Sequence, residues 1–438
     1  MKKWRALPII IIAAMLGLQA ACQGPSPNVL TQHNDNSRSG AYLAETHLTP
    51  ANVNTASFGK LYERNVDGDT VAQPLYLRSV QTSSGTKNLF FVTTSKNIIY
   101  AFDAENMDQD PTHGLVWQRQ LCSSVQANIC SETWSGLVGI TATPVIDAGT
   151  NSMYVVARCS DGSNGPNDGA IYIYDLNVGD STDRVTPVKI TATDPNGVNF
   201  DFHCERNRPG LLLSNGVIYA GFGTFSCDQG CPGAPYHGWV LGYRSSDLTQ
   251  VAVFDTSPKN GGLSGIWQTG NGLAAGGDGS IYVETGNGPT SEPLQDSFVK
   301  LAPSGTAPGL TLAGSFSPNN SGTLAAGDTD LGSGGPNALA AGPYSGWRET
   351  GPILCARPGQ HDADAGHGTG WVWVQRLPGF YQHLPQRQFA TELSASGWRR
   401  GLRPDDGGSY LLHRSDQIRE RRIVWTKYSR RPGFLAAR

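Results

Sequence analysis

A short aromatic strand recurs four times along this chain at an almost constant interval, and this period constrains the fold more than any other feature. The four segments begin at Phe91, Tyr154, Tyr219 and Tyr282, and by subtraction successive starts lie 63, 65 and 63 residues apart. A fixed period of this size predicts one supersecondary unit repeated along the chain.

The units share the same internal order of short strands. An apolar strand precedes the aromatic one, at 72–77, 142–146, 208–213 and 267–273. An alternating strand follows it, at 99–103, 171–175, 239–243 and 297–301, and a last apolar segment lies near 116–117, 188–190, 251–254 and 310–316. Short alternating runs separated by Gly, Asn, Asp and Ser are typical of antiparallel meanders. We therefore expect no helix after residue 25.

The composition suits a protein made of many tight turns. The chain has 54 glycines and 27 prolines, and only 16% of its residues are charged. A four-stranded sheet that is apolar on both faces must stack on others, and radial stacking gives a β-propeller. A β-sandwich is the alternative, but its strands recur at about 8–12 residues without a longer period. We predict an all-β protein, an incomplete β-propeller of four-stranded antiparallel blades over residues 56–336, with four to five recognisable blades.

The N-terminus predicts export. Lys2, Lys3 and Arg5 precede an apolar run over 6–18 that ends in Gln-Ala-Ala before Cys22, as in a secretory signal peptide. The end of this run resembles the lipobox of bacterial lipoproteins, in which the cysteine becomes the lipidated N-terminus. Residues 1–22 are the expected signal peptide of the lipoprotein type, with Cys22 as the residue that carries the lipid. Residues 23–55 would form a tether and a polar segment. Ordinary secretion is the alternative, so the expected location is the outer membrane or cell surface, the periplasm, or the medium.

Six cysteines lie between residues 122 and 231. An even number in an exported chain favours disulfides over a metal site. The pairs closest in sequence are Cys122 with Cys130 and Cys227 with Cys231, and these are the pairings we expect. We predict no metal here, because no second pair of cysteines or histidines lies at zinc-finger spacing.

The pattern of strands stops after residue 336, and the charge changes sign nearby. Residues 1–340 carry a net charge of −10, whereas residues 341–438 carry +7 with 14 arginines. A separate basic tail that binds nucleic acid or anionic lipid would explain this change. We favour a change of reading frame near residues 337–342.

The genetic code supports a change of reading frame. The codons that can encode residues 354–362, when they are read one nucleotide later, permit the peptide YALDRDNM. The first repeat contains YAFDAENM at 100–107, so five of eight letters agree. Residues 337–438 would then be an aberrant Arg-rich tail that forms no blade, leaves Trp371 and Trp373 exposed, and leaves the ring open.

Residues 31–336 resemble a family of exported bacterial proteins with repeats of the quinoprotein (pyrroloquinoline-quinone-like) propeller. The resemblance rests on the motifs QHNDN at 32–36, LTPANVN at 48–54, AQPLY at 72–76, YAFD at 100–103, PYHGWV at 235–240, GIWQ at 265–268 and DLGSGGP at 330–336. It implies a propeller fold. It does not imply quinone binding, because many members of this superfamily are not catalytic.

The chain departs from the enzymes of that superfamily. Quinoprotein dehydrogenases typically carry two adjacent cysteines and a calcium-binding set of Glu, Asn and Asp, and this sequence has no adjacent cysteines. It also lacks the Cys-x-x-Cys-His motif of covalent haem attachment. We predict no cofactor. Pyrroloquinoline quinone and Ca²⁺ belong only to the alternative, a dehydrogenase of alcohols or sugars.

Three polar groups are candidates for binding. His33, Asn34 and Asn36 precede the first blade and could hold a ligand, although such side chains more often cap turns and tie the N-terminal strand to the rest of the fold. His203 and Glu205 lie near Asp201 and could ligate a metal, although Arg206 and Arg208 are nearby partners for the carboxylates.

His237 precedes a strand in the motif PYHGWV and could act on a substrate in the central channel. No nucleophile accompanies it in the sequence, so a hydrogen-bonded packing role is favoured. We assign no catalytic residue and no metal ligand.

The expected function is therefore that of an exported, non-catalytic propeller that binds a protein or carbohydrate at the cell envelope. We expect no nucleic-acid partner, and contact with the membrane only through an N-terminal lipid. The alternatives are the quinone-dependent dehydrogenase and a lipoprotein that helps to assemble outer-membrane proteins, as one similar propeller does. A change of frame could also leave the product inactive.

Overall fold

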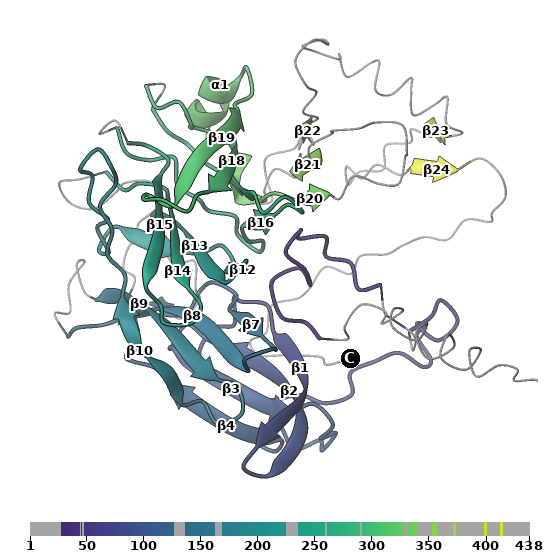
Figure 1. Ribbon diagram of the computed structural model, residues 1–438. Helices are drawn as coiled ribbons and strands as arrows, with labels where there is room; N and C mark the ends of the chain where they lie inside the picture. Colours follow the sequence, from purple (N-terminus) through teal and green to yellow (C-terminus); the bar gives the residue numbers. More distant parts are fainter. Residues whose placement is uncertain are drawn as a thin grey trace, which may run out of the picture.

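Antiparallel sheets follow one another along the chain in the computed structural model, which confirms the all-β, bladed architecture (Figure 1). The structure describes residues 28–43, 45, 48–126, 136–162, 169–224, 235–258, 261–289, 291–327, 329 and 331–339. Beyond residue 340 it describes only the backbone of four short strands. Within the described part of the chain, no helix has the length and apolar character needed to cross a bilayer.

Each blade is a meander in which neighbours in sequence are neighbours in the sheet. The first blade contains β1 (Leu75–Thr82), β2 (Gly85–Thr93), β3 (Ile98–Asp103) and β4 (Leu115–Gln120). The second contains β7 (Val145–Asp147), β8 (Ser152–Cys159), β9 (Ala170–Asn177) and β10 (Asp183–Lys189). A small sheet of β5 (Val125–Gln126) and β6 (Leu137–Val138) lies between them in the chain.

The third blade contains β12 (Leu212–Ser214), β13 (Val217–Thr224), β14 (Trp239–Arg244) and β15 (Gln250–Asp255), and β11 (Glu205–Asn207) pairs with the far end of β13. The fourth contains β16 (Ala274–Ala275), β17 (Ile281–Glu284), β18 (Phe298–Pro303) and β19 (Leu310–Phe316). The aromatic segments that revealed the period are the second strands β2, β8, β13 and β17. Their aromatic residues at 91, 154, 219 and 282 are all buried, because each second strand lies inside its sheet.

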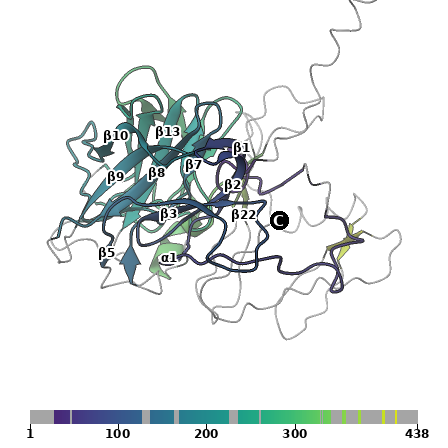
Figure 2. The ribbon, with the colours of Figure 1, turned by 90° about the horizontal axis from the view of Figure 1, so that it is seen from below.

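The blades form an open arc. One apolar cluster joins the first blade to the second, another joins the second to the third, and a third joins the third to the fourth. The outer face of the first blade is covered by Tyr62 and that of the fourth by Leu331 and Ala338. None of the described clusters joins the fourth blade to the first. Figures 1 and 2 show the same succession of sheets from two directions.

Two expectations about elements need correction. The first strand of the fourth blade is β16 and begins one residue after the expected segment 267–273. A six-residue helix, α1 (Ser321–Ala326), follows the fourth blade, and a 3₁₀ turn covers Leu331–Ser333. The helix buries no side chain and ends at Gly327, so it adds a surface turn and leaves the core unchanged.

The tail contains more sheet than expected. β20 (Ala338–Leu339), β21 (Ile353–Ala356) and β22 (Trp371–Trp373) form a three-stranded antiparallel sheet, and β23 (Trp398–Arg400) pairs with β24 (Leu412–Arg414). This sheet has one strand fewer than each of the four blades. The expected exposure of the Trp371 and Trp373 side chains lies outside the described residues.

The expected pairing of Cys122 with Cys130 is wrong in this structure. Cys122, just after β4, forms a disulfide with Cys159 at the end of β8, with a Cα–Cα distance of 5.5 Å. Closeness in sequence favours the local pair, but stacking of the blades brings a residue 37 positions away into reach. Cys204 is also disulfide-bonded. Cys130, Cys227, Cys231 and the proposed lipidation site Cys22 lie outside the described residues.

Candidate functional site

The inner edge of the arc, here called the hub, consists of the edge strands β1, β7, β12 and β16. β12 contacts both β7 and β16, so these short strands succeed one another around the hub. The polar N-terminal segment lies along this edge, where Figure 1 shows it in purple. This placement supports the expectation that the motif QHNDN ties the N-terminal segment to the rest of the fold.

His33, Asn34 and Asn36 have structural roles in the N-terminal segment and in its contacts with the neighbouring blades. The His33 backbone N–H donates to Gln73 Oε1 at 3.0 Å, and the Asn36 side-chain amide donates to the Leu213 carbonyl at 2.7 Å. His33 and Asn34 both have left-handed backbones, with φ of 55° and 70°. Burial lowers the pKa of His33, and the nearby Arg38 lowers it further.

His203 and Glu205 point to different partners. His203 Nδ1 lies 2.9 Å from Asp201 Oδ1, whereas Glu205 is buried and accepts a hydrogen bond from the His237 backbone N–H at 2.8 Å. The predicted proximity of Asp201 and His203 is therefore correct, but Glu205 belongs to the cluster around His237.

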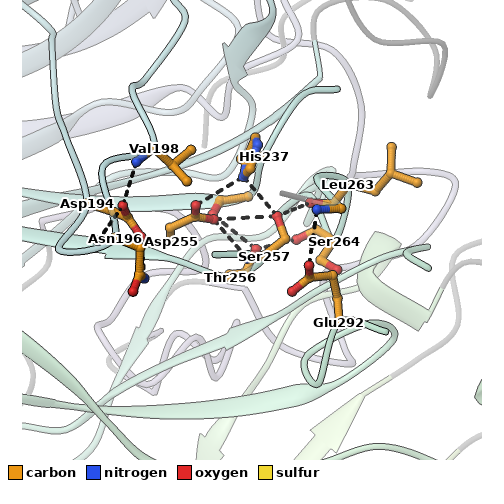
Figure 3. A network of polar contacts seen from close by, with 12 residues as sticks. Asp194, Asn196, Val198, His237, Asp255, Thr256, Ser257, Leu263, Ser264 and Glu292 are labelled. Carbon is orange, nitrogen blue, oxygen red and sulfur yellow. Dashed lines mark hydrogen bonds and ion pairs between the residues drawn. The ribbon is translucent and has the colours of Figure 1, made fainter. Parts of the chain in front are cut away.

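His237 lies in a buried network of polar contacts (Figure 3). Its Nδ1 lies 3.0 Å from Asp255 Oδ2 and 3.1 Å from Ser257 Oγ. The His237 side chain is 9% exposed and that of Asp255 is fully buried. The Ser257 hydroxyl lies 3.1 Å from the Leu263 carbonyl and donates to it, so the His237 Nδ1–H is shared between a carboxylate and the hydroxyl oxygen.

This geometry is not that of a hydrolytic triad. In such a triad the serine contacts one ring nitrogen of the histidine and the aspartate contacts the other. Here both Asp255 and Ser257 contact the same nitrogen, Nδ1. Ser257 therefore cannot transfer its proton to His237 along that route, and the cluster fixes the orientation of the imidazole.

Two carboxyl groups are buried in the third and fourth blades. Burial raises the pKa of Glu205 well above its ordinary value, and the hydrogen bond from the His237 backbone opposes that increase. Burial likewise raises the pKa of Glu284, whose Oε2 accepts a hydrogen bond from the Gly335 backbone N–H at 3.1 Å. Both groups therefore favour the neutral, protonated state inside the fold.

Reasoning from the sequence missed Asp255 and Ser257. Trp239 pairs with Asp255 in the β14–β15 ladder, so extending the register by two residues places His237 opposite Ser257. The available signal was therefore the strand register of this one hairpin. A register shift between Gly242 and Tyr243 hides it from simple counting along the sequence.

Within the part of the chain that the structure describes, the residues do not fit the calcium and quinone of the alternative reading. Ca²⁺ takes about six to eight oxygen ligands, but among the residues that the structure describes no three His, Cys, Asp or Glu side chains converge on one point. The cavity lined by Arg158, Arg206 and Asn207 has a volume of about 10 Å³, room for about one water molecule. Pockets for cofactor-sized ligands have about 300–1,000 Å³. We therefore derive no chemical step through either group.

Comparison with known proteins found similarity only to solved structures. No family model and no curated protein matches the sequence. Solved structures with similar shape include a quinohemoprotein alcohol dehydrogenase from Pseudomonas putida, at 14% identity and a TM-score of 0.46 over 76% of this chain and 45% of that one. The enzyme of the same class from Comamonas testosteroni matches at 12% identity and 0.45, over 80% of this chain and 46% of that one.

A europium-containing methanol dehydrogenase matches at 11% identity and a TM-score of 0.42, over 76% of this chain and 55% of that one. The chain thus spans about half the length of these proteins. Similarity at this level identifies no substrate or cofactor, and the fold assignment rests on the strand pairing of this chain itself.

Proposed function

We propose that this protein is an exported, non-catalytic β-propeller arc that acts as a binding or scaffold module at the cell envelope. One observation carries the proposal. Residues 29–38 hydrogen-bond along the hub to the edge strands of all four blades, and they fill the inner edge where a propeller has its central channel. Recognition by such a protein falls to the loops and outer surfaces of a rigid scaffold.

The polar cluster supports the same proposal. His237, the candidate for acting on a substrate in the central channel, is held at Nδ1 by Asp255 and Ser257 and at its backbone by Glu205. These contacts tie β11, β14 and β15 together. All of these contacts are explained if His237 is a packing residue whose ring is held in one orientation.

The quinone-dependent alternative gives the sharpest test. Purified protein is incubated with pyrroloquinoline quinone and Ca²⁺, and dye reduction is followed with a panel of alcohols and sugars. A quinoprotein dehydrogenase reconstituted in parallel is the positive control. We expect no turnover above the rate without protein, and sustained turnover would overturn the non-catalytic proposal.

We also propose that the protein is anchored by lipid at Cys22, with a protein or carbohydrate partner. A Cys22→Ser variant should move from the membrane fraction to the soluble envelope fraction, whereas equal partition of both forms would favour ordinary secretion. Cross-linking in intact cells then distinguishes the partners. Specific recovery of a barrel-assembly complex would replace the general scaffold role with one in outer-membrane assembly.

A further inference from the structure

We propose that residues 29–38 form an internal clasp that holds the open arc of blades together in place of ring closure. This inference concerns how the arc persists, and it does not depend on the proposed function. It rests on the contacts that the segment makes with every blade.

The backbone of the clasp pairs with the edge strands one after another. Val29 exchanges two hydrogen bonds of 2.8 Å with Tyr76 on β1, and the Ile146 N–H on β7 donates to the Leu30 carbonyl at 2.8 Å. Edge strands expose unpaired N–H and C=O groups that other segments can cover. The clasp covers these groups on the first two blades.

The same segment continues to the other end of the arc. The Asn36 side chain donates to the Leu213 carbonyl on β12 at 2.7 Å, and the Ala275 N–H on β16 donates to the Asn36 carbonyl at 2.7 Å. The Ala338 N–H on β20 donates to the Ser37 carbonyl at 2.9 Å. Ten consecutive residues therefore connect all four blades and the first strand of the tail sheet.

Arg38 is the most deeply buried polar group of the clasp, at 1% exposure. Its guanidinium donates to the Leu273 carbonyl at 2.8 Å, to the Leu211 carbonyl at 2.9 Å, and to Thr31 Oγ1 and the Gln32 carbonyl within the clasp, at 2.7 and 2.8 Å. Leu211 precedes β12 and Leu273 precedes β16. One side chain thus joins the third blade, the fourth blade and the clasp.

The blades are shaped to accept the clasp. A Cβ atom at Gly272 would lie 3.0 Å from Arg38 Nη2, and a Cβ at Gly210 would lie 2.8 Å from Gln32 Cβ. Arg38 itself has a left-handed backbone, with φ of 62°. Such conformations in non-glycine residues persist where the surrounding contacts hold them. The fit therefore involves both the clasp and the glycines that face it.

Hydrogen–deuterium exchange of the full-length protein tests the clasp. An Arg38→Met variant keeps most of the apolar stem and removes the four donated hydrogen bonds. We expect exchange to accelerate about tenfold or more at β7, β12 and β16 together, because hydrogen bonds of charged groups are strong and leave buried carbonyls unpaired when lost. Arg78→Met, at an exposed position on β1, is the matched control and should leave these strands unchanged.

A milder variant keeps the proposal testable if Arg38→Met does not fold. Asn36→Ala removes one hydrogen bond, to Leu213, and should accelerate exchange at β12 and β16 while the protein stays folded. Acceleration confined to residues 29–40 in either variant would contradict the clasp, since the segment would then be only a local N-terminal contact.

Discussion

At the scale of single residues, the protein places ionisable groups where burial decides their charge. Arg38 lies at the hub, and burial lowers its pKa to about 9, so it stays charged at neutral pH and depends on carbonyl oxygens for solvation. Burial shifts the pKa of the Glu205 carboxyl in the other direction, well above its ordinary value. Burial disfavours the charged form of both groups. Arg38 starts from an ordinary pKa of 12.5 and has four acceptors around its guanidinium, whereas the His237 backbone and the Trp239 side chain only partly offset the burial of the Glu205 carboxyl.

Glu205 makes the stability of the protein dependent on pH. Its folded-state pKa is raised above the ordinary value of 4.5. Below that pH the carboxyl is protonated in both states. As the pH rises, the unfolded chain ionises first, so the free energy of unfolding of the wild type falls until the folded-state pKa is reached.

A Glu205→Gln variant should remove this contribution. We expect stability close to that of the wild type at pH 4 and higher than the wild type at pH 8, measured by urea denaturation. One unit of pKa difference corresponds to about 1.4 kcal/mol. Glu105→Gln, at an exposed position, is the control and should give a small difference at both pH values. Parallel stability curves for Glu205→Gln and wild type would contradict the assignment.

At the scale of elements, consecutive blades are joined by outer strands as well as by apolar faces. Trp117 on β4 donates its indole N–H to the Val178 carbonyl at 2.9 Å, and Arg119 on the same strand pairs with Asp183 of β10 at 2.7 Å. The Val253 N–H on β15 donates to the Pro308 carbonyl before β19 at 2.8 Å. The first blade is therefore held to the second, and the third to the fourth, at their outer strands as well as through their apolar faces.

The disulfide between Cys122 and Cys159 adds a covalent link between the first two blades. It closes a loop of 37 residues, and the chain-entropy model gives about 4 kcal/mol for a loop of that size. The double variant Cys122→Ser/Cys159→Ser should therefore unfold at clearly lower urea concentration. Peptide mapping under non-reducing conditions checks the pairing, and recovery of a Cys122–Cys130 peptide would show that the structure has the wrong partner.

At the scale of the whole molecule, the succession of four-stranded blades stops where the repeat in the sequence stops. The outer face of the fourth blade carries Phe298, which packs against Phe316 at a ring distance of 6.3 Å. Phe316 is 37% exposed. In a longer propeller this face would meet the next blade, because apolar faces of blades stack on one another. We propose that a change of reading frame near residues 337–342 replaced a fifth four-stranded blade with the present tail.

The nucleotide sequence tests that proposal directly. Read one position later from the codons for residues 337–342, it should encode a fifth repeat with the spacing of the other four. Protein made from a gene with the frame restored should resist limited proteolysis beyond residue 340, where the present chain should be cut first. A shifted frame without a repeat would remove the hypothesis and leave the Arg-rich tail as a native segment.

Much of the architecture could be predicted from the sequence because it depends on local pattern. The period near 64 residues, the aromatic strands at Phe91, Tyr154, Tyr219 and Tyr282, and the Gly- and Asn-rich turns identify the blades one by one. Each signal lies within one repeat, and alternation of apolar residues is a property of neighbouring positions.

The candidate site was predicted only in part, for a physical reason. The sequence alone determined a repeated antiparallel meander and the break in it after residue 336. Only the tertiary structure decided that Cys122 meets Cys159, that Glu205 supports His237, and that Arg38 joins two blades at the hub. These contacts connect residues far apart in the chain, so they depend on how the blades stack and on the register of their strands, which no local pattern encodes.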